Sequence, residues 1–324
     1  MKKIILIFVI NFVFLGLLFP QIILEKRFLS DTEFSDESLP KNEEDEADQG
    51  IENEDEDENP TKLIDQEETY FRARYPFKFG SMSFIPSLES LRRNSSISNF
   101  SGITLKSGVS LVERNFPAEL VDESATFGFS YDFPDTDSIY FGYTGGKSSA
   151  GKSGNNNKNA DYSETVLLYD YYPEQDSYYR FGVFNSETKG YNSTYPVIGY
   201  YYEGDTFRLR ILPPVYARMY YDLNPNWGVN FKVNSVSNLY RLDDTDFNGQ
   251  ALTYRAVEFN GGIQYQPFGS ILINIDIGVR TNQAYLFGPA ESADIDEAGI
   301  DTLSLKDTGY VKLYFTLGPR NTPE

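Results

Sequence analysis

The sequence contains no histidine and no cysteine. Histidine is the side chain that most often acts as a general base near neutral pH and most often binds transition metals. Without cysteine, disulfides, thiolate metal sites, cysteine nucleophiles and lipoprotein acylation are all excluded. We therefore expect a protein that is not an enzyme, with no catalytic, cofactor-binding or metal-binding residue.

Positive charge is also scarce, because 28 Lys and Arg stand against 48 Asp and Glu. The imbalance is concentrated at the start of the chain, where the segment up to Thr69 has 6 basic and 19 acidic residues. Residues 31–68 repel one another and bury little apolar surface, so we expect an acidic disordered linker over residues 25–69. Since phosphate binding needs clustered Lys and Arg, the charge pattern argues against nucleic acid as a partner.

Long hydrophobic runs are absent except at the N-terminus. Lys2 and Lys3 precede an apolar run from Ile4 to Phe19, which is typical of a secretory signal. No small-residue cleavage site follows it, so an uncleaved anchor reaching Leu24 is the alternative to a cleaved signal peptide at residues 1–24, which we favour. We interpret residues 70–101 as an irregular segment, either periplasmic or a plug.

From about Gly102 onward, apolar and polar residues alternate. In the segment 271–279, for example, isoleucine or valine stands at every second position. A period of two is the pattern of β-strands with unlike faces, and no comparable stretch has a helical period. Residues 102–324 are therefore predicted to form an all-β domain. The same alternation is found at 127–133, 207–211, 227–233 and 311–317.

Short turns and longer polar connections alternate along this domain. Counting a first strand at Ile103–Leu111, this order predicts an antiparallel up-and-down β-barrel of about 12 strands, within roughly 10 to 14, with both chain ends on the short-turn side. Pro213-Pro214 is an exception, because a tight turn stands where a long connection is expected. The short turns lie at 134–137, 173–176, 203–205, 224–226 and 267–269, and the longer connections at 145–161, 186–194, 243–250 and 288–306.

Strand length, aromatic residues and glycines favour a transmembrane barrel over a soluble one. Several strands run to about ten residues, the length that crosses hydrocarbon when tilted. Aromatic residues crowd the strand ends beside short turns, as in the girdles of membrane barrels, and glycines recur on the polar face, which fits a crowded lumen. The aromatic residues include Tyr169, Tyr171, Tyr172, Tyr178, Tyr179, Tyr220, Tyr221 and Trp227, and the glycines include Gly128, Gly142, Gly182, Gly228, Gly262 and Gly278.

The segment from Gly204 to Phe287 resembles predicted bacterial outer-membrane β-barrels that are classed as a domain of unknown function. The resemblance is carried by Gly204-Asp205-Thr206-Phe207-Arg208-Leu209, Leu212-Pro213, Asn226-Trp227-Gly228-Val229 and Tyr240-Arg241-Leu242. It implies an outer-membrane address and no established activity. The last strand, with Gly309, Leu313 and Phe315, is similar to the assembly signal of such barrels, although the chain continues to Glu324. The barrel-assembly machinery is therefore an expected partner.

One segment matches a nucleotide-binding pattern. Gly146-Lys147-Ser148-Ser149-Ala150-Gly151-Lys152-Ser153 has the spacing of a phosphate-binding loop. That mechanism needs a helix after the loop, whose amides hold the phosphates, and the sequence continues with glycine and asparagine instead. We therefore expect no nucleotide. Barrel-embedded lipases, acyltransferases and proteases resemble one another in using a histidine, which this chain lacks.

The polar face carries the candidate functional residues. If the apolar face meets lipid, basic residues outnumber acidic ones in the lumen, and inward Arg and Lys favour anions. The hypothesis is a narrow, weakly anion-preferring pore for small solutes; the alternative is that these charges pair and fill a small bore. The candidate lumen-lining charges are Arg180, Arg208, Arg210, Arg218, Asp222, Lys232, Glu258, Asp276, Arg280 and Lys312.

Two other functions remain open at this stage. A plugged barrel could serve as a surface-exposed, adhesin-like interaction protein through the longer connections at 145–161 and 288–306. A soluble periplasmic β-barrel would instead hide its apolar face. The expected location is the bacterial outer membrane, with both termini periplasmic and outer-membrane lipid as the surrounding partner. The sequence does not indicate the oligomeric state.

Overall fold

The computed structural model describes residues 21–34, 63–98, 103–104, 110–111, 119–134, 137–151, 160–188, 191–241, 250–268, 271–289 and 301–317. The predictions for residues 1–20 and 35–62, which include most of the signal peptide and most of the acidic linker, lie outside this part. Among the described residues, no helix is long and apolar enough to span a membrane. The elements of the described part are β-strands, so the all-β prediction is confirmed.

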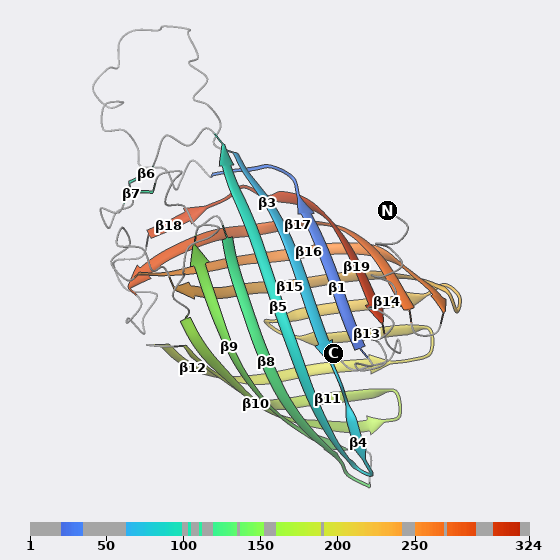
Figure 1. Ribbon diagram of the computed structural model, residues 1–324. Helices are drawn as coiled ribbons and strands as arrows, with labels where there is room; N and C mark the ends of the chain where they lie inside the picture. Colours follow the sequence, from blue (N-terminus) through green and yellow to red (C-terminus); the bar gives the residue numbers. More distant parts are fainter. Residues whose placement is uncertain are drawn as a thin grey trace, which may run out of the picture.

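Fourteen antiparallel strands form the wall of a closed barrel, each paired with the next along the chain (Figure 1). The last strand pairs with the first, with Phe315 opposite Leu24, which closes the wall. The count lies within the predicted range. The wall strands are β1 (Gln21–Leu29), β3 (Leu63–Arg74), β5 (Met82–Ser98), β8 (Glu119–Asp132), β9 (Ser138–Gly151), β10 (Ala160–Glu174), β11 (Ser177–Thr188), β12 (Tyr191–Glu203), β13 (Phe207–Leu212), β14 (Tyr216–Asp222), β15 (Trp227–Arg241), β16 (Gln250–Phe268), β17 (Ile271–Pro289) and β19 (Thr308–Leu317).

Five short strands lie outside this ring. They are β2 (Thr32–Glu33), β4 (Phe77–Phe79) and β18 (Asp301–Ser304), which pair with wall strands, and β6 (Ile103–Thr104) with β7 (Ser110–Leu111), which pair only with each other. The strand predicted at Ile103–Leu111 is therefore not part of the wall.

The barrel begins at Gln21 and not near Gly102. The prediction of an irregular segment at 70–101 is wrong, because β3 and β5 pair over twelve successive positions from Leu63 to Arg74. The linker predicted for 25–69 likewise overlaps β1, β2 and β3, and the segment predicted as a signal or anchor includes the first residues of β1. These strands escape a period-two search because the halves of β3 and β5 near the long connections are polar on both faces.

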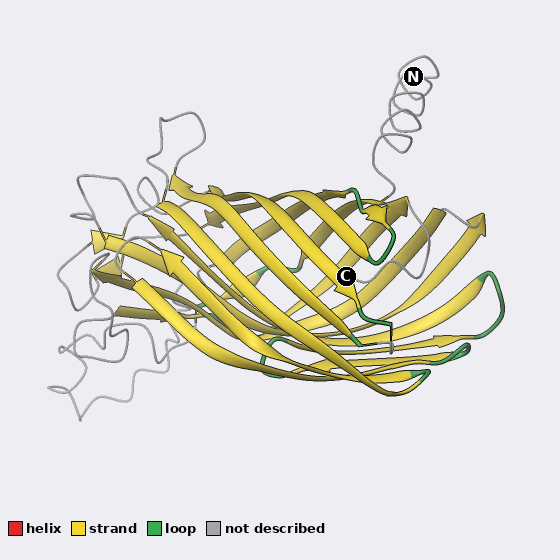
Figure 2. Ribbon diagram, turned by 90° about the horizontal axis from the view of Figure 1, so that it is seen from below, coloured by secondary structure: helices red, strands yellow, loops and turns green. Residues whose placement is uncertain are grey.

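The two ends of the barrel differ. Short turns at 133–137, 175–176, 204–206 and 223–226 gather at one end, which Figure 2 shows in green. At this same end β1 begins and β19 finishes, since Ile22 lies opposite Leu317. We call it the short-turn end and the opposite one the long-connection end. The acidic residues 35–62 join β2 to β3 and thus follow the first wall strand at the long-connection end.

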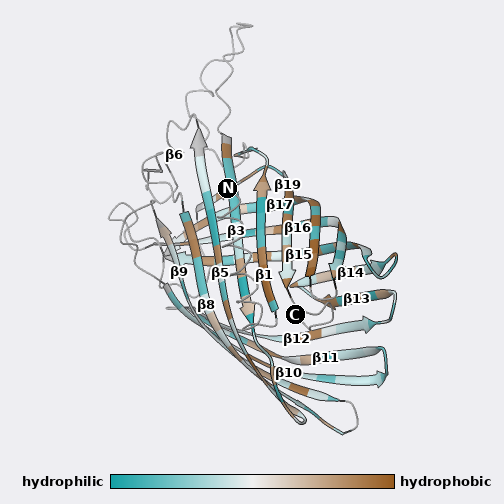
Figure 3. Cartoon of the chain, turned by 45° about the vertical axis from the view of Figure 1, so that its right-hand side comes forward, coloured by the Kyte–Doolittle hydropathy of each residue, from teal (hydrophilic) through white to brown (hydrophobic). Residues whose placement is uncertain are grey.

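The outer surface is apolar and the inner surface is polar. On β17, Ile275 and Ile277 are 49% and 68% exposed. Asp276, which lies between them, and Arg280, further along the strand, are fully buried. Val229, Ile273 and Leu313 are also exposed on the outside, as predicted. Apolar and polar positions alternate along the wall in Figure 3. A soluble protein buries such rows, so this surface faces hydrocarbon and the soluble-barrel alternative is not supported.

The aromatic residues near the short turns divide between the two faces. Tyr171 and Tyr179 are exposed on the outer surface, as a girdle requires. Tyr172 and Tyr178 instead stack on each other inside the lumen, with ring centroids 4.7 Å apart, because neighbouring strand positions point to opposite faces. The girdle prediction is therefore wrong for these two residues, and also for Tyr220, which is buried and lines an interior cavity.

The inward glycines make room for larger side chains, as predicted. A Cβ on Gly262 would lie 1.9 Å from Oδ1 of Asp276, and a Cβ on Gly128 would lie 2.7 Å from the Tyr140 hydroxyl. Any larger residue at Gly262 would displace the carboxylate of Asp276 from its hydrogen bonds.

The outward position of Ile275 gives a test of the lipid-facing surface. We expect Ile275→Arg, at the centre of the apolar row of β17, to destabilise the barrel in lipid vesicles by about 2–4 kcal/mol. Thr281→Arg, at the first outward position beyond the row, should lower the free energy of unfolding by less than about 1 kcal/mol, because the penalty falls towards the interface. Equal effects in denaturant titrations would contradict the assigned membrane position.

Candidate solute pathway in the barrel interior

One side of the lumen is filled by buried ion pairs. Arg280 on β17 lies 2.9 Å from Glu68 on β3 and 2.6 Å from Glu258 on β16. Arg27 pairs with both of these carboxylates, and Arg93 pairs with Glu68. Since β1 and β19 separate β3 from β17 in the wall, these contacts cross the lumen. These five side chains fill this part of the lumen, and we call them the central ion cluster.

A second buried group adjoins this cluster towards the short-turn end. Asp276 accepts a hydrogen bond of 3.1 Å from Lys232, while Lys312 lies 3.9 Å from Asp276 and 3.5 Å from Glu25. Lys232 also donates to the hydroxyl of Tyr314 at 3.1 Å. Each of these charges is therefore compensated by neighbours on other strands.

The remaining predicted charges lie along β10 to β14. Arg180 makes two hydrogen bonds to Asp170, of 2.7 and 2.8 Å, and Arg210 donates to Glu203 at 2.6 Å. Arg208 lies 3.3 Å from Asp222. Arg218 lies over the ring of Tyr216, 4.3 Å from its centroid, and donates to Asn234 at 3.3 Å. All ten predicted residues thus project to the inner face; their role towards a solute stays a prediction.

The sequence-based set misses about half of the interior charges. The charges on β1, β3 and β5 were missed because these strands were not recognised. The charges on β8, β10 and β12 were missed because the inner row of these strands also carries apolar residues, so the two faces are hard to tell apart by sequence. The missed residues are Glu25, Arg27, Glu68, Arg72, Arg74, Glu89, Arg93, Asp122, Glu164, Asp170 and Glu203. With seven carboxylates among them, the described interior is close to charge balance and not basic.

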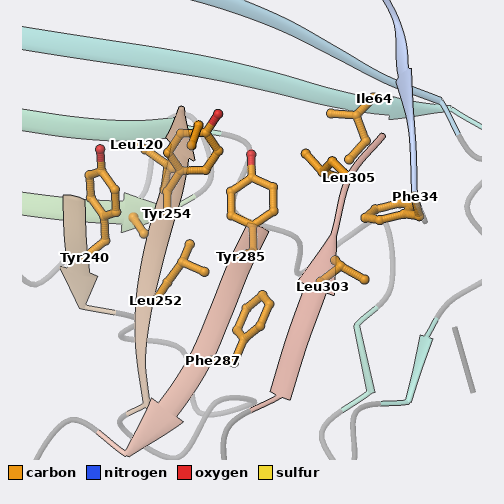
Figure 4. Close-up of a cluster of buried hydrophobic side chains, with 12 residues drawn as sticks. Phe34, Ile64, Leu120, Tyr240, Leu252, Tyr254, Tyr285, Phe287, Leu303 and Leu305 are labelled. Atoms are coloured by element: carbon orange, nitrogen blue, oxygen red, sulfur yellow. The ribbon is translucent and has the colours of Figure 1, made fainter. Parts of the chain in front are cut away.

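An apolar cluster spans the lumen at the long-connection end (Figure 4). It joins Leu120 and Ala150 on β8 and β9 to residues of β15 to β18, although β10 to β14 separate the two groups in the wall. The Ser148 hydroxyl on β9 donates to the Leu239 carbonyl on β15 at 2.7 Å, which shows that the barrel is flattened here. The cluster, which we call the apolar plug, comprises Phe34, Ile64, Leu120, Ala150, Tyr240, Leu252, Tyr254, Ala256, Tyr285, Phe287, Leu303 and Leu305.

Three cavities that share lining residues lie beside these filled parts, among the described residues. The first, of about 270 Å³, lies near the short-turn end and is lined by Ser138, Tyr140 and Arg180. It shares Glu89 and Thr126 with a second cavity of about 590 Å³ in the long-connection half. A third, of about 430 Å³, lies beside the central ion cluster and shares Tyr70 and Leu91 with the second. Together they form a route along the unfilled side of the barrel.

The cavities differ in charge. The 590 Å³ cavity is lined by Glu89, Asp122 and Glu164, with neither Lys nor Arg among its described lining residues. Asp122 accepts a hydrogen bond of 2.7 Å from the Tyr162 hydroxyl. The 430 Å³ cavity has more basic than acidic groups: its lining includes Arg27, Arg72, Arg93, Arg218, Lys232 and Lys312 against Glu25, Glu68 and Glu258. The pathway therefore presents an acidic and a basic section.

The segment that matches a phosphate-binding loop does not adopt one. Residues Gly146 to Gly151 are part of the extended strand β9, and Ser148 points into the lumen. Residues 152 and 153 of the pattern lie outside the described part. The strand lacks the turn of amides that cradles phosphates, which argues against a nucleotide site.

No family model matches the sequence, and no curated protein matches it. Among solved structures, an outer-membrane channel from Pseudomonas putida F1 is 8% identical, with 92% of this chain and 95% of that chain covered and a TM-score of 0.46. The P. putida toluene transporter TodX is 10% identical, with 93% and 90% covered and a TM-score of 0.39. The translocator domain of the autotransporter NalP from Neisseria meningitidis is 8% identical, with 92% and 87% covered and a TM-score of 0.31.

Similarity at this level carries no argument about function, and the fold assignment rests on the strand pairing of the chain itself. The closed wall of an even number of strands, the apolar outer surface and the polar interior define the chain as a transmembrane β-barrel of the outer-membrane type.

Glu68 provides a test of the central ion cluster. Glu68→Gln leaves three buried arginines around a neutral amide, so we expect the free energy of unfolding to fall by roughly 3–5 kcal/mol. Glu67→Gln, at the preceding residue, removes only an exposed ion pair with Lys26 and should cost less than about 1 kcal/mol. Denaturant titration followed by the fluorescence of the single tryptophan, Trp227, measures both. Equal shifts would show that Glu68 does not balance the cluster.

Proposed function

We propose that the protein is a narrow channel for small solutes in the bacterial outer membrane. The observation that carries this proposal is the chain of three cavities, of about 270, 590 and 430 Å³, beside the central ion cluster. A barrel that served only as an anchor would gain stability by filling this space, because close-packed interiors are the most stable. Solutes would pass along the unfilled side, between β3 and β12.

The asymmetry of the barrel supports an orientation. In outer-membrane barrels the short turns face the periplasm and the longer connections face outward. The start of β1 and the end of β19 would then lie on the periplasmic side, and the acidic residues 35–62 would belong to an outward-facing connection. Assembly by the barrel-assembly machinery is part of this proposal, with β19 and its outward Leu313 as the final strand.

A weak anion preference is the finer part of the proposal. It is supported by the 430 Å³ cavity, where Arg72, Arg218 and Lys312 contribute to an excess of basic groups. The preference would be weak because carboxylates balance most of these cations and because the adjoining 590 Å³ cavity is acidic. Only basic side chains that border open space can act on a passing ion.

A second function is favoured by the apolar plug. Because it spans the lumen at the long-connection end, the barrel could be a closed anchor whose outer connections bind a partner. Of the connections predicted for this role, residues 145–151 and 160–161 belong to β9 and β10, and residues 288–289 and 301–304 to β17 and β18. Residues 152–159 and 290–300 lie outside the described part. A variant that no longer conducts but still binds its partner would favour this alternative.

Reversal potentials in planar bilayers under a salt gradient test the channel and its selectivity. The unmodified protein should conduct and show a slight preference for anions. Arg218→Glu, which reverses a charge at the basic cavity, should shift the reversal potential towards cation preference, because lumen charge sets ion selectivity. Arg92→Glu, on the outer surface of β5, is the matched control and should have little effect. Absence of conductance would refute the channel, and equal behaviour of both variants would refute the selectivity.

A further inference from the structure

The barrel wall is incomplete between β12 and β15 in the long-connection half. The hairpin of β13 and β14, with 6 and 7 residues, is only about half as long as β12 and β15, with 13 and 15 residues. β12 pairs with β13 only from Tyr200 to Glu203, and the pairing of β15 with β14 ends at Asn234. Beyond these points, the facing edges of β12 and β15 have no strand partner among the described residues. We call this opening the wall gap.

The 590 Å³ cavity reaches the wall gap from inside. Its lining includes the inward carboxylates Asp122 and Glu164 together with Ser237 and Leu239, which belong to the outward row of β15. A cavity can border both faces of one strand only where it passes the edge of that strand. The cavity therefore continues through the wall to the outside.

The height of the wall gap is set by the outward row of β15. This row is apolar from Val229 to Val233 and polar at Ser235 and Ser237, with Leu239 after them near the end of the strand. The last bond between hairpin and β15, from the Ser235 amide to the Val215 carbonyl at 2.8 Å, lies at the same boundary. The wall gap thus begins where hydrocarbon gives way to the interfacial layer, and unpaired strand edges are tolerated only outside hydrocarbon.

The side chains at this edge combine rings with hydroxyls. Phe184 and Tyr195 stack with centroids 4.9 Å apart, and Tyr195 is 39% exposed although it stands on the inward row of β12. Ser186 and Ser193 line the cavity beside them. Such a surface suits a small molecule with an apolar ring and hydrogen-bonding groups.

We propose that the wall gap is the outer exit of the pathway, and that it releases small amphipathic solutes sideways into the membrane interface. The apolar plug fills the lumen between β8, β9 and β15 to β18 at the same end. The 590 Å³ cavity lies beside it, along β10 to β12, and borders the wall gap directly. This inference rests on the proposed channel function. Solutes that partition into the interfacial layer would leave the polar lumen there without crossing the apolar plug.

Single cysteines test the exit, because the chain has no native cysteine. Ser193→Cys and Ser237→Cys place a thiol at the two edges of the wall gap, and Thr194→Cys places one on the outer face of β12 as a control. Potassium chloride conductance is compared before and after labelling with a bulky methanethiosulfonate reagent. Labelling at 193 or 237 should remove most of the current, and labelling at 194 should leave it unchanged.

The outcomes separate the two proposals. Absence of current in the unlabelled protein would refute the channel itself. Current that is insensitive to complete labelling at both 193 and 237 would refute the side exit and leave the channel standing. Each comparison is made within one folded variant, so misfolding does not imitate the result.

The solute class is tested with phenol as the probe. Phenol should reduce the ion current reversibly, and Tyr195→Ala should raise the half-blocking concentration by roughly three- to tenfold, the factor expected for one aromatic contact. Phe181→Ala removes an outward ring from β11 and should leave the half-blocking concentration unchanged. Equal block in all three proteins would show that the ring pair does not bind the solute.

Discussion

The backbone of this barrel must form its hydrogen bonds within the wall, because hydrocarbon offers no partner to an exposed peptide group. The pairing of β19 with β1 meets this requirement by removing both free edges of the sheet. Closure also separates two surfaces that must differ in chemistry: an outer one that meets lipid and an inner one that does not. The alternation of side chains along each strand then distributes the sequence between them.

The interior is organised by the need to neutralise charge away from bulk water. Unpaired buried ions are strongly unfavourable, so Glu68 and Glu258 are surrounded by arginines of neighbouring strands and of strands that two others separate from them in the wall. These contacts fill one side of the lumen and leave the cavities on the other. The apolar plug at the long-connection end adds a second constraint, because it fills the lumen between β8, β9 and β15 to β18 and leaves the cavity on the side of β10 to β12.

The wall gap shows how one local feature of the sequence acts on the whole pathway. Pro213-Pro214 ends β13 early, and β14 begins two residues later, at Tyr216. Beyond the hairpin, the facing edges of β12 and β15 have no further strand pairing among the described residues, at the height where the outer surface becomes polar. The tight turn that breaks the regular order of short and long connections thus coincides with the place where the cavity leaves the barrel.

The sequence by itself determined the all-β class, the outward direction of Val229, Ile273 and Leu313, and the inward direction of the ten candidate charges, because period two fixes faces without reference to neighbours. It did not reveal β1, β3 and β5; on β3 and β5, polar residues occupy both faces near the long connections. Only the tertiary structure decided which charges neutralise each other, where the lumen is filled and where the wall is open. These properties depend on contacts between strands far apart in the chain, such as Glu68 with Arg280, and no local period encodes such distances.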